Sequence, residues 1–217
     1  MRGAFFPSED LACRLGVYEL QVQHKLKEML GRGMTFYDVG ANVGFHSLLG
    51  ARRIGNQGHV YAFEPLAQNS KRLCELMRVN HVSNFTLIEA AVSNQVGSTE
   101  FFSGPSPAQA SLSPSGRNSF SVRTTDLDTF ASANRWPDLI LMDIEGFEGM
   151  ALQGATAILS SKRRPAWIVE VHNLNCRNEC EELFQTTRHQ VEVLMPVVPR
   201  KGLYPLHLLA RPGISSE

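Results

Sequence analysis

A glycine-containing turn is the stretch of this sequence that most directly predicts ligand binding. The residues Asp38-Val39-Gly40-Ala41-Asn42-Val43-Gly44 follow a short segment rich in strand-forming residues. Gly40 permits a sharp turn and close approach of a ligand to the backbone, and Gly44 permits close packing of the following helix. Asp38, at the strand end, can accept hydrogen bonds from a ligand ammonium group or from backbone N–H groups. The turn is therefore a candidate site for a small ligand.

The spacing within this turn differs from two common nucleotide-binding motifs. In the dinucleotide motif G-x-G-x-x-G the middle glycine lets a pyrophosphate approach, and here Asn42 takes its place. The phosphate loop G-x-x-x-x-G-K-[ST] is also absent. Glu64 ends the next strand segment, a position from which an acidic side chain can accept hydrogen bonds from ribose hydroxyls. The turn and Glu64 together predict a nucleoside-type ligand without a pyrophosphate.

Two further pairs of polar residues follow later strand segments. Asp143 and Glu145 form one pair, and Glu170 and His172 form the other. Residues i and i+2 of an extended chain point to the same face, so we expect all four side chains at the sheet edge that holds the turn. His172 is the leading candidate for a general base because its unperturbed pKa is near neutral. Asp143 or Glu145 could orient it, or could bind a divalent cation.

Structural roles for the same residues remain open. His172 could be a hydrogen-bonded histidine at a strand end, and Glu145 could stabilise the N-terminus of a helix through its charge. Cys176 and Cys180 lie near His172, but a zinc site needs about four ligands and no further pair completes one. We therefore expect ordinary thiols and no metal site. His46 is expected to face the helix surface, outside the site.

Apolar periodicity predicts the elements that position these residues. Strand-like segments alternate with helical ones, which favours right-handed crossovers and a mostly parallel sheet. The predicted strands are residues 34–39, 59–63, 85–88, 138–142 and 166–169, followed by an antiparallel hairpin of residues 191–194 and 206–209. The predicted helices include residues 22–30, 66–79, 149–159 and 178–187. We expect an N-terminal helical segment (residues 1–33) packed on one ligand-binding domain (residues 34–217).

One segment interrupts the alternation. Residues 103–121 are rich in Ser, Pro and Gly and have no periodic apolar face. A loop of this length inside a compact domain is usually functional or disordered. It is predicted to be an insertion, either a segment that covers the substrate or a solvated loop.

Composition limits the class of protein. The chain has 217 residues, with 21 basic and 21 acidic side chains that give a formal net charge of zero. DNA-binding domains usually carry a basic excess, so DNA is not an expected partner. No apolar run is long enough for a membrane helix, the N-terminus does not resemble a signal peptide, and four cysteines do not suggest a disulfide scaffold. These features predict a reduced, cytoplasmic protein.

The sequence resembles the FkbM family of S-adenosylmethionine-dependent methyltransferases. The resemblance spans about Gly16 to His172, and it rests mainly on the stretches Asp-Val-Gly-Ala-Asn and Asp-Ile-Glu-Gly-Phe-Glu. The matching segments are Tyr18-Glu19, residues 36–44, Phe63-Glu64-Pro65, Ala90-Ala91-Val92-Ser93, Thr124-Thr125-Asp126-Leu127-Asp128 and residues 142–148. One departure is Asp126, where the family more often has Thr.

The resemblance implies a class I methyltransferase (Rossmann-like) fold with a seven-stranded, mostly parallel sheet and a reversed last hairpin. It also implies methyl transfer to oxygen. Asp38, Gly40 and Asn42 would hold the methionine end of the donor, and Glu64 would hold its ribose. Glu89 or Ala90 would lie near adenine. The full set of donor-binding candidates is Asp38, Gly40, Ala41, Asn42, Gly44, Glu64, Pro65, Glu89, Ala90 and Asp143; the catalytic candidates are His172, Asp143 and Glu145.

The leading functional hypothesis is an S-adenosylmethionine-dependent O-methyltransferase. Its acceptor would be a hydroxyl group of a small molecule, a sugar or a glycolipid. The Asn-Pro-Pro-Tyr and Asp-Pro-Pro-Tyr signatures of amino-group methylation on nucleic-acid bases do not occur. Two alternatives are a nicotinamide-dependent oxidoreductase, which Asn42 argues against, and an S-adenosylmethionine-binding protein without catalysis.

Overall fold

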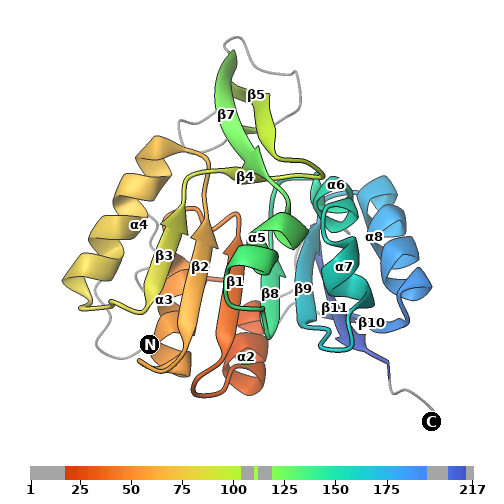
Figure 1. Ribbon diagram of the computed structural model, residues 1–217, viewed down its shortest axis with the longest axis horizontal. Coiled ribbons are helices and arrows are strands. Elements are labelled where there is room, and N and C mark those ends of the chain that lie inside the picture. Colours follow the sequence, from red (N-terminus) through yellow and green to blue (C-terminus); the bar gives the residue numbers. More distant parts are fainter. Residues whose placement is uncertain (1–17, 104–109, 112–118, 195–204, 214–217) are drawn as a thin grey trace.

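A seven-stranded sheet forms the centre of the protein (Figure 1). The computed structural model describes residues 18–103, 110–111, 119–194 and 205–213. The strands lie in the order β10-β11-β9-β8-β1-β2-β3, and only β11 runs against its neighbours. Their bounds are β1 (Thr35–Val39), β2 (His59–Phe63), β3 (Phe85–Ile88), β8 (Leu139–Met142), β9 (Ala166–Val171), β10 (His189–Leu194) and β11 (Leu206–Pro212). The predicted seven-stranded, mostly parallel sheet with an antiparallel C-terminal hairpin is confirmed.

Helices cover both faces of this sheet. In Figure 1, α5 (Leu127–Ala133), α6 (Glu148–Gln153) and α7 (Thr156–Ser160) lie in front of it, and α2 (Leu20–Met29) and α3 (Phe45–Ile54) lie behind. Helices α4 (Ala67–Val79) and α8 (Leu174–Thr186) complete the two layers.

Side chains of successive strand residues enter alternate cores, which explains the nearly continuous apolar runs of the strands. Phe36 and Leu141 are fully or almost fully buried on the α2 and α3 side. Tyr37, Ile140 and Trp167 are buried on the other side, among residues of α5 to α8. Packing in both cores therefore holds the carboxyl ends of the strands along one edge of the sheet.

Two predicted helices have different bounds in the structure. The single helix expected at residues 149–159 is two short helices, α6 and α7, which meet at Gly154 and Ala155. A side chain at Gly154 would collide with the backbone oxygen of Ser93 at 2.3 Å, so the chain is tightly packed there. Helix α8 begins earlier than expected because the Asn173 side chain accepts a hydrogen bond from the Cys176 N–H at 2.9 Å and caps it.

The segment predicted as a long loop contributes to a second, smaller sheet. Its strands are β4 (Ala91–Val92), β5 (Gly97–Ser103), β6 (Ala110–Ser111) and β7 (Ser119–Thr125), in the order β4-β7-β5-β6. The loop prediction was wrong at residues 103, 110–111 and 119–121, because residues 110–111 and 119–121 pair with β5, which itself includes residue 103. The rest of the segment lies outside the described residues. This small sheet extends beyond the carboxyl ends of the main strands (Figure 1).

Helix α2 packs against the sheet through Val22 and Leu26, which are completely buried beside Phe36 and Ile54. Residues 1–17 of the predicted N-terminal segment lie outside the described residues, so its boundary stays a prediction. Among the helices described here, none has the length and apolar character needed to cross a membrane.

Candidate active site

The turn after β1 has a backbone that only glycine adopts without strain. Gly40 has a φ angle of 83°, and its N–H and that of Ala41 donate to the Phe63 carbonyl at 3.0 and 2.9 Å. A Cβ atom at Gly40 would lie 1.9 Å from the backbone oxygen of Asp143. Gly40 therefore lets the ends of β1, β2 and β8 meet closely enough to share one pocket.

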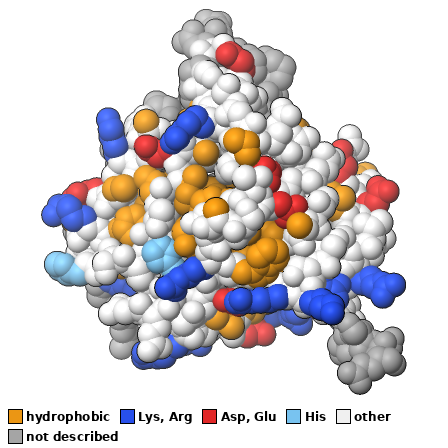
Figure 2. Space-filling model, in the orientation of Figure 1, with side chains coloured by type: hydrophobic (Ala, Val, Ile, Leu, Met, Phe, Trp, Pro, Cys, Tyr) orange, Lys and Arg blue, Asp and Glu red, His pale blue; other side chains and the backbone are white. Residues whose placement is uncertain are grey.

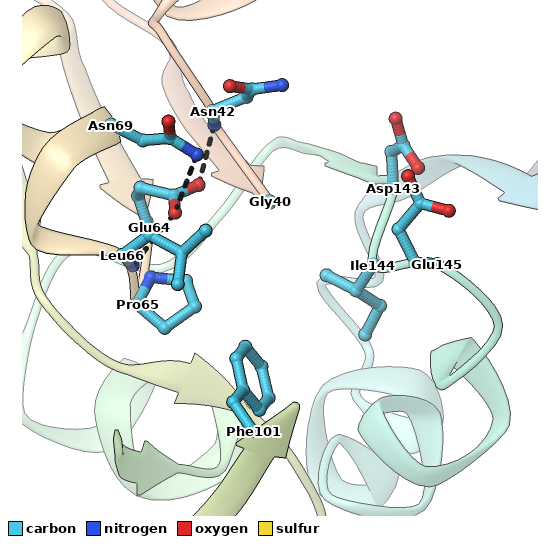
Figure 3. A pocket seen from close by; sticks show the side chains of 10 residues that line it. All are labelled: Gly40, Asn42, Glu64, Pro65, Leu66, Asn69, Phe101, Asp143, Ile144 and Glu145. Carbon is cyan, nitrogen blue, oxygen red and sulfur yellow. Dashed lines mark hydrogen bonds between the residues drawn. The ribbon is translucent and has the colours of Figure 1, made fainter. Parts of the chain in front are cut away.

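Glu64 forms the polar wall of this pocket (Figure 3). Its side chain is almost completely buried and accepts hydrogen bonds from the backbone N–H groups of Asn42 (2.8 Å) and Leu66 (2.9 Å). The Asn69 amide donates to the same carboxylate at 3.3 Å. Burial raises the pKa of Glu64, and these donors oppose the rise. The carboxylate is thus held in place, with lone pairs left to accept from a ligand.

The pocket combines predicted residues with others that the sequence did not indicate. Six predicted residues line it, namely Gly40, Asn42, Glu64, Pro65, Asp143 and Glu145, together with the unpredicted Leu66, Asn69, Phe101 and Ile144. An adjoining apolar hollow is lined by Gly40, Phe63, Pro65, Ala90, Ala91, Val92, Phe101, Ile144 and Phe147. Phe101, from the small sheet, belongs to both. No local pattern could have placed it here, because its position depends on the pairing of β5 with β7.

Four predicted donor-binding residues do not line either hollow. Asp38 is only 2% exposed and accepts a short hydrogen bond from the Ser47 hydroxyl. Burial, which outweighs this bond, raises the pKa of Asp38 to about 7. Ala41 and Gly44 are buried within the turn. Glu89 is exposed beyond β3, while its backbone oxygen accepts from the Arg123 guanidinium at 3.1 Å.

A cluster of three carboxylates surrounds His172 on the opposite side of the pocket. The imidazole Nε2 lies 3.6 Å from Asp143 Oδ1 and 3.5 Å from Glu145 Oε2, and Nδ1 lies 3.5 Å from Glu148 Oε1. The structure thus brings all three catalytic candidates together. It adds Glu148, which is completely buried and which the sequence did not single out.

The electrostatics of this cluster differ from the sequence expectation. Burial lowers the pKa of His172, but the carboxylates of Glu148, Asp143 and Glu145 outweigh it and raise the pKa to about 9. The unperturbed, near-neutral pKa from which the sequence argument started therefore does not apply here, because three acids surround one imidazole. At neutral pH this imidazole holds its proton.

The Asp143 carboxylate faces this imidazole. Burial is the largest cause that raises its pKa to about 6, and a side-chain hydrogen bond with Glu170 and the charge of His172 counteract it. Its Oδ1 atom is buried and has no hydrogen-bond partner among the residues the structure describes. Asp143 is also the residue that joins this cluster to the pocket wall. A carboxylate in this position can accept a proton from a bound molecule.

Other candidates have structural contacts. Cys74, Cys176 and Cys180 are free cysteines, as expected, and the Cys176 thiol donates to Glu148 Oε2 at 2.9 Å. Cys13 lies outside the described residues. The prediction that His46 faces the helix surface was wrong. Its ring packs against Tyr18 and Phe45, and its Nε2 atom is buried 3.8 Å from Glu19 Oε2.

The surface viewed in Figure 2 carries charges of both signs. Lys and Arg side chains are dispersed among acidic and apolar ones, and several lie along the lower rim, at the amino ends of the parallel strands. They do not gather around the small sheet on this face. The described residues on this face form no broad basic patch of the kind typical of nucleic-acid binding.

Comparison with known proteins identifies the family. A family profile described as the methyltransferase FkbM domain matches residues 38–194, which is most of the chain. The chain belongs to the FkbM methyltransferase family. The match begins at Asp38 of the turn and contains the whole pocket. Among curated proteins, none matches the sequence.

Solved structures of the same fold include a second FkbM protein. Methyltransferase FkbM from Methylobacillus flagellatus KT superposes with a TM-score of 0.58 at 16% identity, over 93% of this chain and 55% of that one. An rRNA methylase from Streptococcus thermophilus has a TM-score of 0.58 at 11% identity, covering 95% and 99%. Aeropyrum pernix fibrillarin, solved with natively bound S-adenosyl-L-methionine, has a TM-score of 0.53 at 10% identity, covering 87% and 72%.

At these identities the structures establish the fold, and the family match establishes the enzyme class. The FkbM family uses S-adenosylmethionine, so the protein is an S-adenosylmethionine-dependent methyltransferase by family and fold.

Proposed function

We propose that this FkbM protein transfers a methyl group from S-adenosylmethionine to a hydroxyl group of a small molecule, a sugar or a glycolipid. The observation that carries the proposal is a single pocket with two different walls. On one side lie the Gly40 turn and the fixed carboxylate of Glu64, and on the other lies the carboxylate of Asp143.

The donor-side residues suit the parts of S-adenosylmethionine. Glu64 would accept hydrogen bonds from the ribose hydroxyls, and the apolar hollow at Pro65, Ala90 and Phe101 would hold adenine. Gly40 and Asn42 would hold the methionine end with Asp38 behind them. The predicted roles of Ala41, Gly44 and Glu89 would be limited to shaping the turn and the rim. When bound, the donor supplies a methyl group already activated by a cationic sulfur.

On the acceptor side we assign proton transfer to Asp143. A hydroxyl group is a weak nucleophile, and a base in contact with its proton typically contributes 10²–10⁴-fold to a rate. The geometry favours Asp143 over His172 for this role, because Asp143 lines the pocket and His172 does not. His172 remains in the proposed catalytic set, as the cation that lowers the pKa of Asp143 and orients Asp143 and Glu145.

Charge and fold support a small acceptor. The formal net charge of zero provides no general attraction for a polyanion. The rRNA methylase and fibrillarin share the fold alone at 10–11% identity. The small sheet, which carries Phe101 to the pocket, is the element on which we expect the acceptor to rest.

The experiment measures S-adenosylhomocysteine release from S-adenosylmethionine in the presence of a panel of hydroxylated metabolites, sugars and glycolipids. We expect turnover with at least one hydroxyl acceptor. Asp143→Asn should lower the rate at least 100-fold, and His172→Gln should lower it less. Calorimetry with S-adenosylhomocysteine should show donor binding in both variants.

Three results would contradict parts of the proposal. Binding of NAD without binding of S-adenosylmethionine would contradict the reaction. Methylation of a nitrogen or of RNA with no hydroxyl product would contradict the acceptor class. A larger rate loss in His172→Gln than in Asp143→Asn would return the base to His172.

A further inference from the structure

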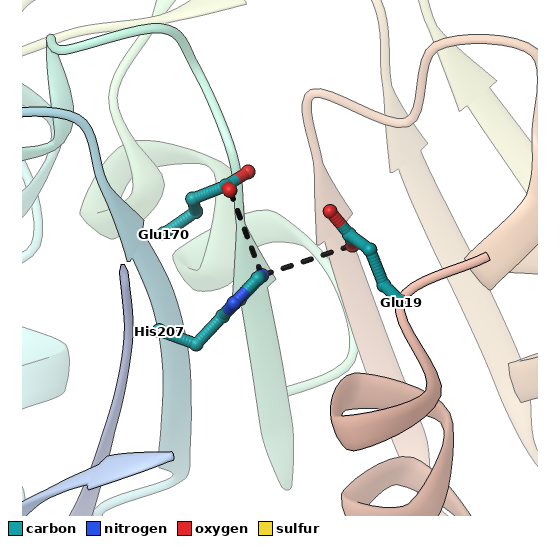
Figure 4. A group of neighbouring side chains, drawn as sticks. All are labelled: Glu19, Glu170 and His207. Atoms are coloured by element: carbon teal, nitrogen blue, oxygen red, sulfur yellow. Dashed lines mark ion pairs between the residues drawn. The ribbon is translucent and has the colours of Figure 1, made fainter. Parts of the chain in front are cut away.

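A second group of acidic and histidine side chains lies behind the pocket, where three distant parts of the chain meet (Figure 4). Glu19 precedes α2, Glu170 lies on β9 and His207 lies on β11. Their side chains are 8%, 5% and 3% exposed. Carboxylates are rarely this deeply buried unless they are paired or bind a metal ion.

The sheet register sets the positions of two of these three residues. His207 and Glu170 are directly opposite each other in the antiparallel β9–β11 pair. Glu19 reaches the same point from the other side, with its backbone in the left-handed region at a φ of 43°. Figure 4 shows the Glu19 and Glu170 carboxylates both directed toward the same imidazole nitrogen.

The separations between these atoms are too long for hydrogen bonds within the group, and Glu170 also forms a side-chain hydrogen bond with Asp143. His207 Nε2 lies 3.7 Å from Glu19 Oε2 and 4.0 Å from Glu170 Oε1, whereas N–H···O hydrogen bonds span about 2.7–3.2 Å. Ligand atoms around one tetrahedral zinc ion, each roughly 2.1 Å from it, are about 3.4 Å apart. The side-chain ligand atoms of all three residues lie within 4.8 Å of one another.

Two neighbouring side chains border this group. His46 presents a buried Nε2 atom, 3.8 Å from Glu19 Oε2, that has no hydrogen-bond partner among the residues the structure describes. The amide of Gln21 lies 3.5 Å from Nδ1 of His207. A histidine that binds a metal through one ring nitrogen commonly has a polar partner at the other, and this partner sets its orientation.

From this geometry we propose that Glu19, Glu170 and His207 bind one divalent transition-metal cation of the Zn²⁺ class. Imidazole together with carboxylate favours Zn²⁺ over Mg²⁺, which prefers oxygen ligands. The ion would fasten the segment before α2 to β9 and β11. The inference does not depend on the proposed methyl transfer.

A second group, Asp143, Glu170 and His172, shares Glu170 and could compete for the ion. We place the ion at Glu19 and His207 because the Asp143 and His172 side chains are more exposed, at 33% and 21%. His172 is also surrounded by three carboxylates already, and its proton neutralises part of their charge.

The test uses the full chain, stripped of metal with a chelator and titrated with Zn²⁺ and separately with Co²⁺. We expect one Zn²⁺ per chain and a Co²⁺ absorption spectrum typical of tetrahedral coordination. Glu19→Gln and His207→Gln should each weaken Zn²⁺ binding at least tenfold. His24→Gln is the matched control, since His24 is an exposed histidine on α2, and it should change the affinity less than twofold.

His172→Gln separates the two groups and should also change Zn²⁺ affinity less than twofold. If His172→Gln loses the ion while His207→Gln keeps it, the proposed position is wrong. Absence of Zn²⁺ and Co²⁺ binding to the wild-type protein overturns the proposal. So does a folded Glu19→Gln variant with wild-type affinity, and this variant remains informative if His207→Gln fails to fold.

Discussion

The two walls of the pocket are built in different ways. The wall from Gly40 to Asn69, which we propose holds the donor and call the donor wall, is fixed mainly by the backbone. Its Glu64 carboxylate accepts from the N–H groups of Asn42 and Leu66, and its turn donates to the Phe63 carbonyl. The acidic wall consists of side chains around His172, and their separations of 3.5–3.6 Å are set by charge and packing. Backbone-fixed sites follow from local sequence, whereas charge clusters depend on which strands are neighbours.

The largest expected effect tests the donor wall at its turn. Gly40→Ala would place a Cβ atom 1.9 Å from the Asp143 backbone oxygen, which cannot move without displacing β8. We expect loss of measurable S-adenosylhomocysteine binding. The free energy of unfolding should fall by roughly several kcal/mol, because alanine is disfavoured in the left-handed region and its Cβ atom would overpack the turn. Calorimetry and urea unfolding measure the two effects.

Gly33→Ala is the control for Gly40→Ala. Gly33 has a similar φ of 81°, but a Cβ atom there would meet nothing within 4 Å. It should lower the free energy of unfolding by only about 1–2 kcal/mol and leave donor affinity unchanged. Equal losses of stability and of donor affinity in the two variants would show that the close approach of Gly40 to the Asp143 backbone oxygen contributes to neither.

The next effect tests the carboxylate of the donor wall. Glu64→Gln removes the charge that receives two backbone N–H groups and, in our proposal, the donor ribose. Hydrogen bonds to a charged group contribute about 1.5–3 kcal/mol, so donor affinity should fall roughly 10- to 100-fold. Glu89→Gln, at an exposed position, should change it less than threefold. A comparable loss in Glu89→Gln would instead support a direct contact of Glu89 with the donor.

A pH effect tests the charge behind the turn. Burial raises the pKa of Asp38 to about 7 in the folded protein, above its value in the unfolded chain. As pH rises from about 4 toward 7, Asp38 ionises more readily in the unfolded chain, so the protein without donor loses stability. A donor ammonium near Asp38 would favour the ionised form. We therefore expect S-adenosylhomocysteine affinity to increase about tenfold from pH 6 to pH 8.

Asp38→Asn should bind the donor more weakly and remove most of this pH dependence. Calorimetry across the same pH range measures both changes. A wild-type affinity that stays constant between pH 6 and pH 8 would mean that Asp38 keeps one protonation state and has no part in holding the donor.

The smallest effect tests the contribution of the small sheet. Phe101→Ala removes an apolar side chain from both hollows and should weaken donor binding about three- to tenfold. Val122→Ala is the control, because Val122 packs beside Phe101 with the same 8% exposure but does not line the pocket. If both substitutions weaken binding equally, the small sheet acts through its stability and not through contact.

The sequence by itself determined the fold class, the glycine turn after β1 and the residue types of the acidic wall. Strand periodicity gave the main sheet, because alternating strands and helices admit few arrangements. The positions of Gly40, Asn42 and Glu64 were predictable because each depends on the ends of two adjacent strands. The charge state of His172 was not, since it depends on Glu148, which reaches it from a separate helix.

Only the tertiary structure decided the remaining features. It turned part of the predicted insertion into a sheet that brings Phe101 to the pocket, because β5 pairs with β7. It also placed Glu19, Glu170 and His207 together, through the β9–β11 register and the packing of α2. Residues so distant in the chain show no spacing pattern, and their chemistry arises only when folding encloses them in one low-dielectric space.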